Sequence, residues 1–171
     1  MNEQAYIDIK TLLDNKNISY RAFEHAECRT SEESAKVRTE AGFPDAIGAK
    51  AILCKVTFRS DGDKFVLFVL PGTHVIDKAK LKQGLPDLKQ FRFATPEELL
   101  DIAGVVPGCM PPFGGQIFPK IEKTYVSSLL KDYERVAFNA AKLNASIILY
   151  ASEYFKVIEP DQILDISKPK D

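Results

Sequence analysis

The chain has 171 residues, of which 45% are hydrophobic and 27% are charged, and its 23 basic and 24 acidic side chains leave a formal net charge of −1. This length and composition are typical of one globular domain with its own core, and they exclude broad disorder and a generally basic protein that binds any nucleic acid. No run approaches the roughly 20 apolar residues that span a bilayer. Neither a membrane nor DNA is therefore expected as a partner.

The three cysteines, Cys28, Cys54 and Cys109, form an odd and widely spaced set. Such a set implies neither a disulfide framework nor a metal site, so a reducing cytoplasm is the expected compartment. His25 and Cys28 have a His-x-x-Cys spacing, but two ligands make a poor zinc site, and no metal or cofactor is predicted. Residues 1–16 carry acids and amides and lack the apolar stretch of a signal peptide.

The first 40 residues predict two helices and a strand. Apolar residues at helical spacing indicate a helix over 3–15, and a short strand follows over 18–23. Thr30 or Ser31 can cap the second helix, which ends near residue 40 before a glycine and a proline.

Two apolar strands in the middle of the sequence form a predicted hairpin. Residues 49–58 and 65–70 are rich in β-forming side chains, and Ser60-Asp61-Gly62-Asp63 between them has the Asp-Gly pair of a tight turn. The second strand ends abruptly at Leu70-Pro71-Gly72-Thr73. Asp77 then caps a short helix that closes at Gly84.

Basic side chains are densest between residues 78 and 92. The segment contains Lys78, Lys80, Lys82, Lys89 and Arg92. By itself, such a run is interpreted as a solvated helix face rather than a nucleic-acid groove. The balanced charge of the whole chain does not exclude a local basic face, because steering depends on where the charges lie.

Helices and strands alternate irregularly in the second half of the chain as well. Thr95-Pro96-Glu97-Glu98 is a capping box with proline at the first helical position, and its helix ends at Gly104. A last short helix begins near Ser152, and the final residues look frayed. Three apolar segments are predicted strands: 121–127, 134–139 and 145–150. The order favours an α+β fold, a single domain with a mixed, mostly antiparallel curved sheet flanked by helices.

The stretch from Gly108 to Gly115, Gly-Cys-Met-Pro-Pro-Phe-Gly-Gly, is the most informative part of the chain. Its two prolines fix two φ angles and remove two N–H donors, so this backbone joins neither a helix nor a central strand. The flanking glycines allow another molecule to approach the main chain. A stiff wall of Met, Pro and Phe suits a small apolar pocket. Lys50, in Gly48-Ala49-Lys50-Ala51, can supply a charge for a phosphate or a polarised carbonyl.

Five segments of the chain occur in an order and at intervals that resemble one known family, the YbaK and prolyl-tRNA-synthetase-associated editing domains. They are Gly48-Ala49-Lys50-Ala51, Leu70-Pro71-Gly72, Ala94 through Leu99, Gly108 through Phe113, and Phe138-Asn139-Ala140. The resemblance covers about residues 23–154. It implies that residues 1–171 form one editing domain with an N-terminal helix over 3–15.

The resemblance implies a trans-acting aminoacyl-tRNA deacylase. Freestanding members remove a small amino acid, such as alanine or cysteine, from tRNA that should carry proline. The implied partners are the acceptor end of a mischarged tRNA and prolyl-tRNA synthetase. A non-catalytic module that binds an aminoacyl-like ligand or a regulatory partner in the same pocket remains the alternative.

The resemblance also implies site residues. The family's counterpart of Lys50 binds the 3′ end of the tRNA or the ester, so Lys50 is the predicted catalytic residue; without the family pattern, a solvated strand-end lysine would be preferred. For Gly72 and Asn139 the alternative to a binding role is a structural role in a turn, and for the double-proline segment it is a plain structural loop. The predicted substrate-binding residues are Gly72, Gly108, Cys109, Met110, Pro111, Pro112, Phe113, Asn139 and Ala141.

Two departures from the family pattern fall where the pocket is expected. Ala141 stands where relatives commonly have glycine after Phe-Asn-Ala, and the following Lys142-Leu143-Asn144 differs from the usual turn. Cys109-Met110 stands where smaller pairs such as Ala-Val are usual. Both departures bear on amino-acid specificity and keep the binding-module alternative open.

No protein nucleophile stands out in the sequence. There is no Gly-x-Ser-x-Gly elbow, the histidines are His25 and His74, and Cys109 is a lone thiol without a partnered histidine. An aminoacyl ester is already activated, so holding it beside water can suffice. The prediction is that backbone amides around Gly108–Met110 polarise the carbonyl while Lys50 fixes the terminal nucleotide. Water, or the thiol of a cysteinyl substrate, attacks, and the ribose hydroxyl of the tRNA can assist.

Overall fold

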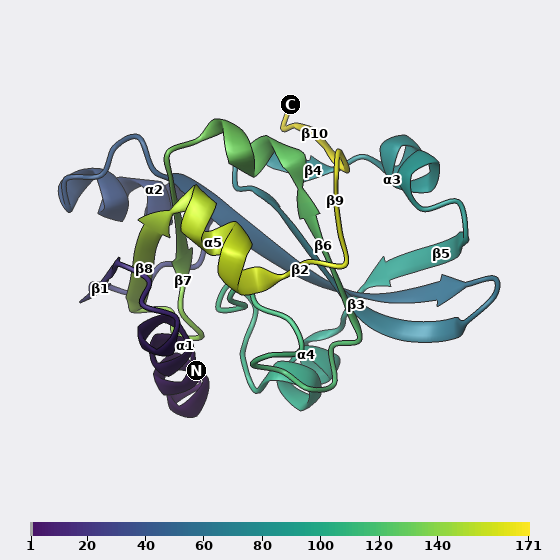
Figure 1. The fold of residues 1–171 in the computed structure, drawn as a ribbon, viewed down its shortest axis with the longest axis horizontal. Helices are drawn as coiled ribbons and strands as arrows, with labels where there is room; N and C mark the ends of the chain where they lie inside the picture. Colours follow the sequence, from purple (N-terminus) through teal and green to yellow (C-terminus); the bar gives the residue numbers. More distant parts are fainter. Residues whose placement is uncertain (1) are drawn as a thin grey trace.

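The computed structural model describes residues 2–171 (Figure 1). The helices are α1 (Glu3–Asn15), α2 (Ser31–Glu40), α3 (Lys78–Gly84), α4 (Pro96–Ala103), the short 3-10 helix η1 (Ser128–Asp132) and α5 (Ala151–Ile158). The strands are β1 (Tyr20–Glu24), β2 (Ile47–Phe58), β3 (Gly62–Pro71), β4 (His74–Ile76), β5 (Leu88–Phe93), β6 (Lys123–Ser127), β7 (Arg135–Asn139), β8 (Ala145–Tyr150), β9 (Gln162–Leu164) and β10 (Ser167–Pro169). Within the described residues, no helix is long and apolar enough to cross a membrane.

The strands form a mixed sheet, which confirms the predicted α+β class. Eight strands lie in the order β1-β8-β7-β2-β3-β6-β9, with β5 paired to β2 off this path. Pairs β1–β8, β7–β8, β2–β3 and β2–β5 are antiparallel, whereas β2–β7, β3–β6 and β6–β9 are parallel. The remaining strands, β4 and β10, form a separate antiparallel pair.

Strand β2 positions the site because it changes neighbours along one edge. Ile47 and Gly48 pair with β7, and residues 54–58 pair with β5 on that same edge. Between them, residues 49–53 have β3 on one side and no paired strand on the other. Figure 1 shows β2 running from the β7 side of the molecule to the β3–β5 side. The sheet is therefore split beside residues 49–53.

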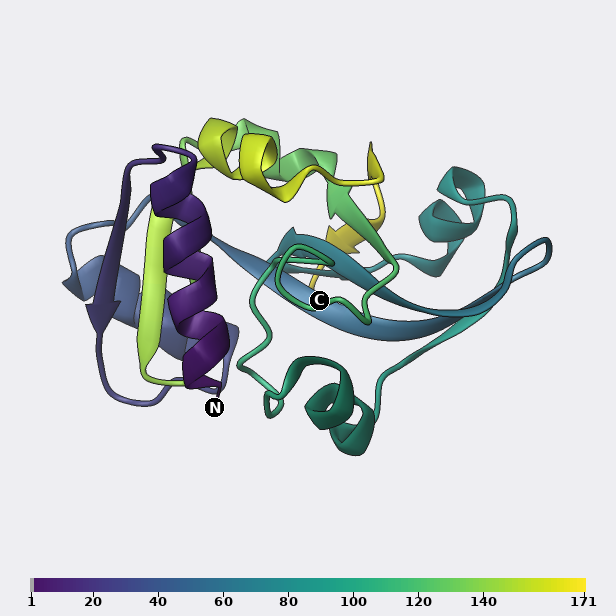
Figure 2. The same ribbon diagram turned by 60° about the horizontal axis from the view of Figure 1, so that its bottom comes forward.

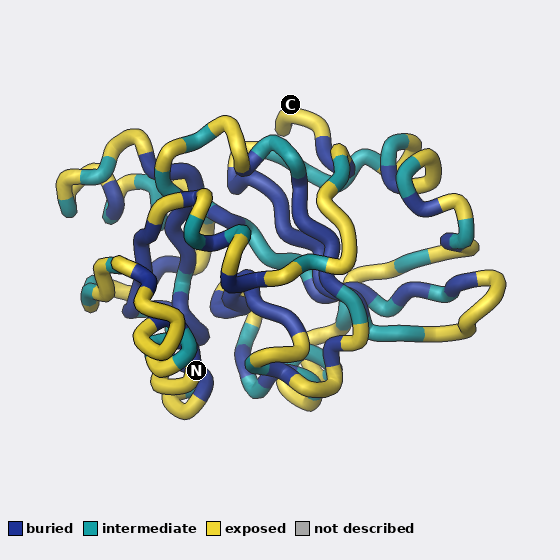
Figure 3. Tube along the Cα trace, in the orientation of Figure 1, coloured by how far each residue is buried: buried dark blue, intermediate teal, exposed yellow. Residues whose placement is uncertain are grey.

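Helices cover both faces of the β1–β8–β7 part of the sheet. Figure 2 shows α1 in front of β8 and α2 behind it. Ile9 and Leu13 of α1 are fully buried in one core cluster with Val136 and Ile147. A second cluster joins Leu81 of α3 to the β2–β3–β5 side. Figure 3 shows the buried chain concentrated in the central strands and the exposed chain at the helix surfaces and the β2–β3 hairpin tip.

The local signals in the sequence place these elements as predicted. Thr30 and Thr95 cap α2 and α4, each with a reciprocal capping box that satisfies free N–H groups of the first turn. Asp77 caps α3, and Gly104 ends α4 in the left-handed conformation. The hairpin turns at Gly62, which has a φ of 73°. The predicted helices and apolar strands all form, with small differences at their ends.

Two expectations about the edges of the fold were wrong. Lys89 and Arg92 do not lie on a helix face; they belong to β5, whose Phe91 packs against the second core cluster while β2 supplies the strand pairing. The C-terminal residues are not frayed. β10 pairs with β4, and the amide of Lys170 donates to the carbonyl of Thr73 at 3.1 Å. Both elements depend on pairing with distant residues, which local patterns do not encode.

Candidate active site

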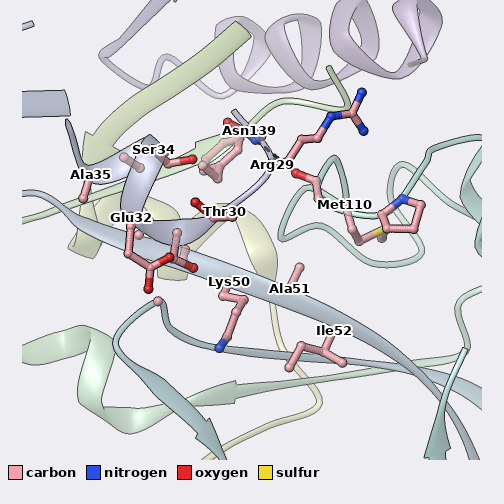
Figure 4. A pocket seen from close by; sticks show the side chains of 18 of the residues that line it. Arg29, Thr30, Glu32, Ser34, Ala35, Lys50, Ala51, Ile52, Met110 and Asn139 are labelled. Atoms are coloured by element: carbon pink, nitrogen blue, oxygen red, sulfur yellow. Dashed lines mark hydrogen bonds between the residues drawn. The ribbon is translucent and has the colours of Figure 1, made fainter. Parts of the chain in front are cut away.

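A cavity of about 720 Å³ opens where β2 leaves β7. This volume lies in the range of small-molecule sites. The walls come from the start of α2, residues 47–53 of β2, the segment leading into α4, the loop around Gly108, and strands β7 and β8. Figure 4 shows Lys50 reaching out from β2, with Thr30 and Glu32 beside it and Met110 and Asn139 farther across.

The main chain of β2 borders the cavity with groups that no neighbouring strand uses. The carbonyl of Gly48 accepts from Gly72 at 2.8 Å on the β3 side, and that of Leu53 accepts from Ala94 at 2.8 Å on the opposite side. Backbone groups alternate between the two sides of a strand. The C=O group of Ala49 and both main-chain groups of Ala51 therefore point toward the split in the sheet, where a ligand can bind them.

The strand register puts polar side chains on one face of the sheet. Gly48 pairs with Ala137, and Asn139 pairs with Ser146. Residues two apart in a strand share a face. Lys50 therefore lies on the same side of the sheet as Asn139 and Ser146, and all three line the cavity.

Lys50 is half-buried on β2, and its Nζ donates a hydrogen bond of 2.5 Å to the backbone carbonyl of His74. Burial lowers the pKa of the ammonium, the nearby Lys170 lowers it further, and Glu32 acts in the opposite direction. A partly desolvated charge interacts more strongly with a ligand than a fully hydrated one. The structure thus places Lys50 as a fixed, shielded cation at the cavity.

Arg38 of α2 is a second cation of the cavity, which sequence reasoning missed. Its side chain is buried, with the residue 9% exposed, and its Nε donates to the carbonyl of Ala46 at 3.3 Å. Within residues 2–171 it forms no ion pair with a carboxylate. A Cβ at Gly48 would lie 3.4 Å from its Nη1, so the glycine leaves room beside the guanidinium. The remaining N–H donors can serve an anionic or carbonyl group of a ligand.

Two glycines bring the main chain close to the cavity. A Cβ at Gly72 would lie 3.5 Å from Ser31 Oγ, and one at Gly108 would lie 3.2 Å from the carbonyl oxygen of Arg29. Gly108 also has a φ of 91°, a conformation that favours glycine. The N–H groups of Gly108 and Met110 donate no hydrogen bond within residues 2–171. They remain free to bind a carbonyl oxygen.

Asn139 ties the two loops beside the cavity together. Its Nδ2 donates to the carbonyls of Cys28 at 3.2 Å and Gly108 at 3.0 Å, which fixes the orientation of the amide. Its Oδ1 then faces Ser146 Oγ at 3.4 Å, and Ser146 Oγ is 2.7 Å from His25 Nε2. His25 and Ser146 were not predicted as a pair, because 121 residues separate them in the sequence.

The structure brings five of the predicted site residues to the cavity and leaves five behind its wall. Those at the cavity are Lys50, Gly72, Gly108, Met110 and Asn139. Those behind it are Cys109, Pro111, Pro112, Phe113 and Ala141, all buried. The expectation that the double proline itself forms the pocket wall is thus corrected: Pro107, Gly108 and Met110 form that part of the wall.

The double-proline segment is packed into the core instead. Phe113 contacts the rings of Phe138 and Tyr154 edge-on, with centroids 5.5 and 6.1 Å away. The buried hydroxyl of Tyr154 donates to the carbonyl of Pro112 at 2.8 Å. Because these contacts turn the prolines away from the cavity, the segment supports the Gly108 loop from behind.

Ala141 adopts a backbone conformation that favours glycine. Its φ is 65°, in the left-handed region, and its side chain is fully buried. The carbonyl of Ala141 accepts a hydrogen bond of 2.8 Å from the amide of Asn2. The departure at this position therefore changes the turn behind β7 rather than the lining of the cavity.

The cysteines do not supply a nucleophile to the cavity. Cys28, Cys54 and Cys109 are buried free thiols. Burial raises the pKa of Cys109, which disfavours the reactive thiolate. Within residues 2–171, no group of three or more His, Cys, Asp or Glu side chains is placed to hold a metal ion.

The model of the aminoacyl-tRNA editing domain family matches residues 25–157. The chain belongs to this family. The match confirms the resemblance on which the sequence prediction rested, and with it the predicted enzyme class, an aminoacyl-tRNA deacylase that acts in translation fidelity. The matched region includes His25, Lys50, Asn139 and Ser146.

Relatives and solved structures agree with this assignment. The Multifunctional Ser/Thr-tRNA deacylase ProXp-y of Escherichia coli K12 is 28% identical over 153 residues, 89% of this chain and 87% of the relative. A crystal structure described as a candidate trans-editing enzyme for prolyl-tRNA synthetase has a TM-score of 0.75 at 19% identity and covers 98% of this chain and 99% of its own. A hypothetical protein has a TM-score of 0.76 at 18% identity, over 94% and 99%. At these identities, the two structures show the fold.

Proposed function

We propose that this protein is a trans-acting deacylase that removes a small amino acid from a mischarged tRNA. The observation that carries the proposal is the cavity at the split in the sheet, where the half-buried Lys50 lies on the stretch of β2 that has no paired strand on the cavity side. Such a site binds the polar ester and the terminal nucleotide while it limits the size of the amino acid.

The proposed roles follow from the chemistry of the lining groups. Lys50 and Arg38 hold the phosphate and ribose of the terminal nucleotide, because both are cations beside open space. The free N–H groups of Gly108 and Met110 bind the carbonyl oxygen as negative charge develops on it. Water attacks the carbonyl carbon, the ester C–O bond breaks, and the products are a free amino acid and the tRNA.

The substrate is proposed to carry a small amino acid, on tRNA-Pro as the sequence resemblance suggests, with prolyl-tRNA synthetase as a partner. Alanine and cysteine are the sequence-based candidates, and the name of the E. coli relative adds serine and threonine. Volume alone discriminates by only about 1–3 kcal/mol per methylene, whereas a site that hydrogen-bonds a hydroxyl rejects analogues without one by about 10⁴-fold or more. The polar side chains of Thr30, Asn139 and Ser146 at the cavity support serine and threonine as the preferred acyl groups.

A panel of charged tRNAs tests the proposal. Purified protein is incubated with tRNA-Pro carrying serine, threonine, alanine, cysteine or proline, and the released amino acid is measured. We expect release of the small amino acids, fastest for serine and threonine, and no release of proline. Binding that shifts the mobility of the tRNA without any release would instead identify a binding module.

A further inference from the structure

Ser146 and His25 form a hydrogen-bonded pair at the edge of the cavity. Ser146 lines the cavity, and its Oγ lies 2.7 Å from His25 Nε2. The other ring nitrogen, Nδ1, lies 2.6 Å from the carbonyl oxygen of Ala26. A carbonyl oxygen can only accept, so Nδ1 carries the proton of the neutral ring. Nε2 therefore presents its lone pair to the hydroxyl of Ser146.

The hydroxyl proton of Ser146 has two acceptors within reach and can serve one. Asn139 Oδ1 is 3.4 Å from Ser146 Oγ, whereas His25 Nε2 is 2.7 Å away. The shorter contact is the stronger hydrogen bond, so the proton points toward His25. The lone pairs of Ser146 Oγ and the carbonyl oxygen of Asn139 are then left as neighbouring acceptors. A water molecule in the cavity can donate one proton to each.

We propose that Ser146 is a catalytic residue of the deacylation and that His25 acts through it; this inference rests on the proposed function. The attacking water gives a proton to Ser146 Oγ, and Ser146 passes its own hydroxyl proton to His25 Nε2. The water oxygen forms a bond to the acyl carbon, and the ester C–O bond breaks. The 3′ oxygen of the tRNA leaves with a proton returned from His25 through Ser146.

The surroundings favour this proton relay over attack by the serine itself. Ser146 is 5% exposed, and its strand is paired on both sides, with Phe23 and Asn139 opposite it. A side chain held in this way cannot advance far toward the acyl carbon, whereas a water molecule can. The aminoacyl ester is already activated, so a positioned water with a proton acceptor behind it is sufficient.

His25 is held in place for this role outside the cavity lining. Its ring packs against Phe23 with centroids 5.6 Å apart, and its backbone N–H donates to the carbonyl of Asn144 at 2.9 Å. The thiol of Cys28 lies 3.7 Å from Nδ1 and shares the carbonyl of Ala26 at 3.5 Å. These contacts fix the ring so that Nε2 faces Ser146. His25 does not line the cavity, so it acts on the substrate only through Ser146.

The test compares two nucleophiles on the acyl-tRNA that the wild-type protein hydrolyses fastest. Ser146→Ala and His25→Gln should each lower kcat for hydrolysis by about 100-fold or more, with KM changed less than about 3-fold. Hydroxylamine attacks esters without an enzymatic base, so its reaction at the same site should fall less than about 5-fold. The double variant should lose no more than either single variant, because the two residues act as a unit.

Ser127→Ala is the matched control. Ser127, at the end of β6, is likewise a buried serine, but its Oγ accepts from the amide of Leu129, and it does not line the cavity. This variant should retain both reactions. Unchanged hydrolysis in either test variant, a parallel loss of both reactions, or an acyl group trapped on Ser146 would each overturn the relay. If the wild-type protein releases no amino acid from any tRNA, the proposed function itself fails.

Discussion

The ammonium of Lys50 is hydrogen-bonded to the main-chain carbonyl of His74, 24 residues farther along the chain. His74 begins β4, and β4 pairs with β10 near the C-terminus. The position of the charge is thus set by backbone contacts on two sides: β2 carries the lysine, and the β4–β10 pair carries its acceptor. Substitutions of the His74 side chain leave this contact in place, because the carbonyl belongs to the backbone.

Lys50→Met removes the charge while keeping a side chain of similar length. We expect deacylation to fall by about 100-fold or more, the scale seen when one stabilising donor is removed. The free energy of unfolding should change by less than about 1 kcal/mol, because the variant also removes a desolvated charge. Lys55→Met is the control, since Lys55 lies on the same strand and its ion pair among residues 2–171 is with Asp63 at 3.9 Å. Retained turnover in Lys50→Met would remove this residue from the mechanism.

The pH dependence of stability reports the burial of Lys50. Its pKa in the folded protein is lowered, so the unfolded chain holds the proton to higher pH than the folded chain does. Below the lowered pKa, Lys50 is charged in both states, and burying that charge destabilises the folded state. This destabilisation disappears as the pH rises toward the ordinary pKa of 10.5, because the folded protein then holds a neutral lysine. Urea unfolding of the wild type and Lys50→Met at increasing pH should show the difference shifting in favour of the wild type. A constant difference would mean that the ammonium is fully hydrated.

Gly108→Ala tests the close approach of two loops. The new Cβ would lie 3.2 Å from the carbonyl oxygen of Arg29, at a φ of 91°. Gly42→Ala is the matched control, because Gly42 has a φ of 94° and nothing within 4 Å of the new Cβ. Both variants should lose about 1–2 kcal/mol from backbone strain. Only Gly108→Ala should also lose deacylation, and equal activity in the two variants would show that the loop spacing is unimportant.

Tyr154→Phe tests the support behind the cavity wall. The variant removes the buried hydroxyl that donates to the carbonyl of Pro112, so that acceptor is left without its partner. We expect a loss of about 1–3 kcal/mol in the free energy of unfolding, measured in urea. Tyr150→Phe is the control, because Tyr150 is 41% exposed and its hydroxyl can bind water instead. Here the expected change is below about 0.5 kcal/mol. Equal losses would refute the proposed support.

Lys170→Gln tests whether the C-terminal segment takes part in tRNA binding. Lys170 lines the cavity and meets Glu32 at 3.5 Å in an exposed ion pair, and such pairs contribute little to stability. We expect little change in stability, a KM for tRNA raised several-fold, and a salt dependence of binding weakened by about one unit of slope. Loss of this cation should also raise the pKa of Lys50, since Lys170 now lowers it.

Lys168→Gln is the control for that variant. Lys168 lies two residues earlier, on β10, and is exposed outside the cavity lining. Equal effects of the two substitutions on tRNA binding would indicate a general effect of charge and would remove Lys170 from the site.

Sequence patterns predicted those parts of the fold that depend on neighbours in the chain. Thr30, Asp77 and Thr95 each cap a helix through a side chain close in sequence, and the Asp-Gly pair turns the hairpin. β5 was not predicted because most of its residues are exposed and half of them are polar, so pairing with β2 decides its conformation. The three-residue strands β4, β9 and β10 are likewise set by partners elsewhere in the chain.

The site was predicted only in part, for the same physical reason. Lys50 and Asn139 lie in segments that resemble the family, and the structure places both at the cavity. The sequence did not indicate Arg38 as a site residue, because an arginine in a polar helix is usually exposed to solvent. Its burial comes from the packing of α2 on Gly48. His25 and Ser146 meet because β1 and β8 are adjacent strands, a pairing that no local pattern contains.

The change of neighbours along β2 has a consequence for how substrate choice can diverge among relatives. The strand is anchored by β7 at one end and by β5 at the other, so the width of the gap is determined by the backbone of the whole sheet. Replacing a lining side chain such as Met110 alters the shape of the opening without disturbing that architecture. New amino-acid preferences can therefore arise through one or two substitutions in the lining, while the pairing of β2 with β5 and β7 stays the same.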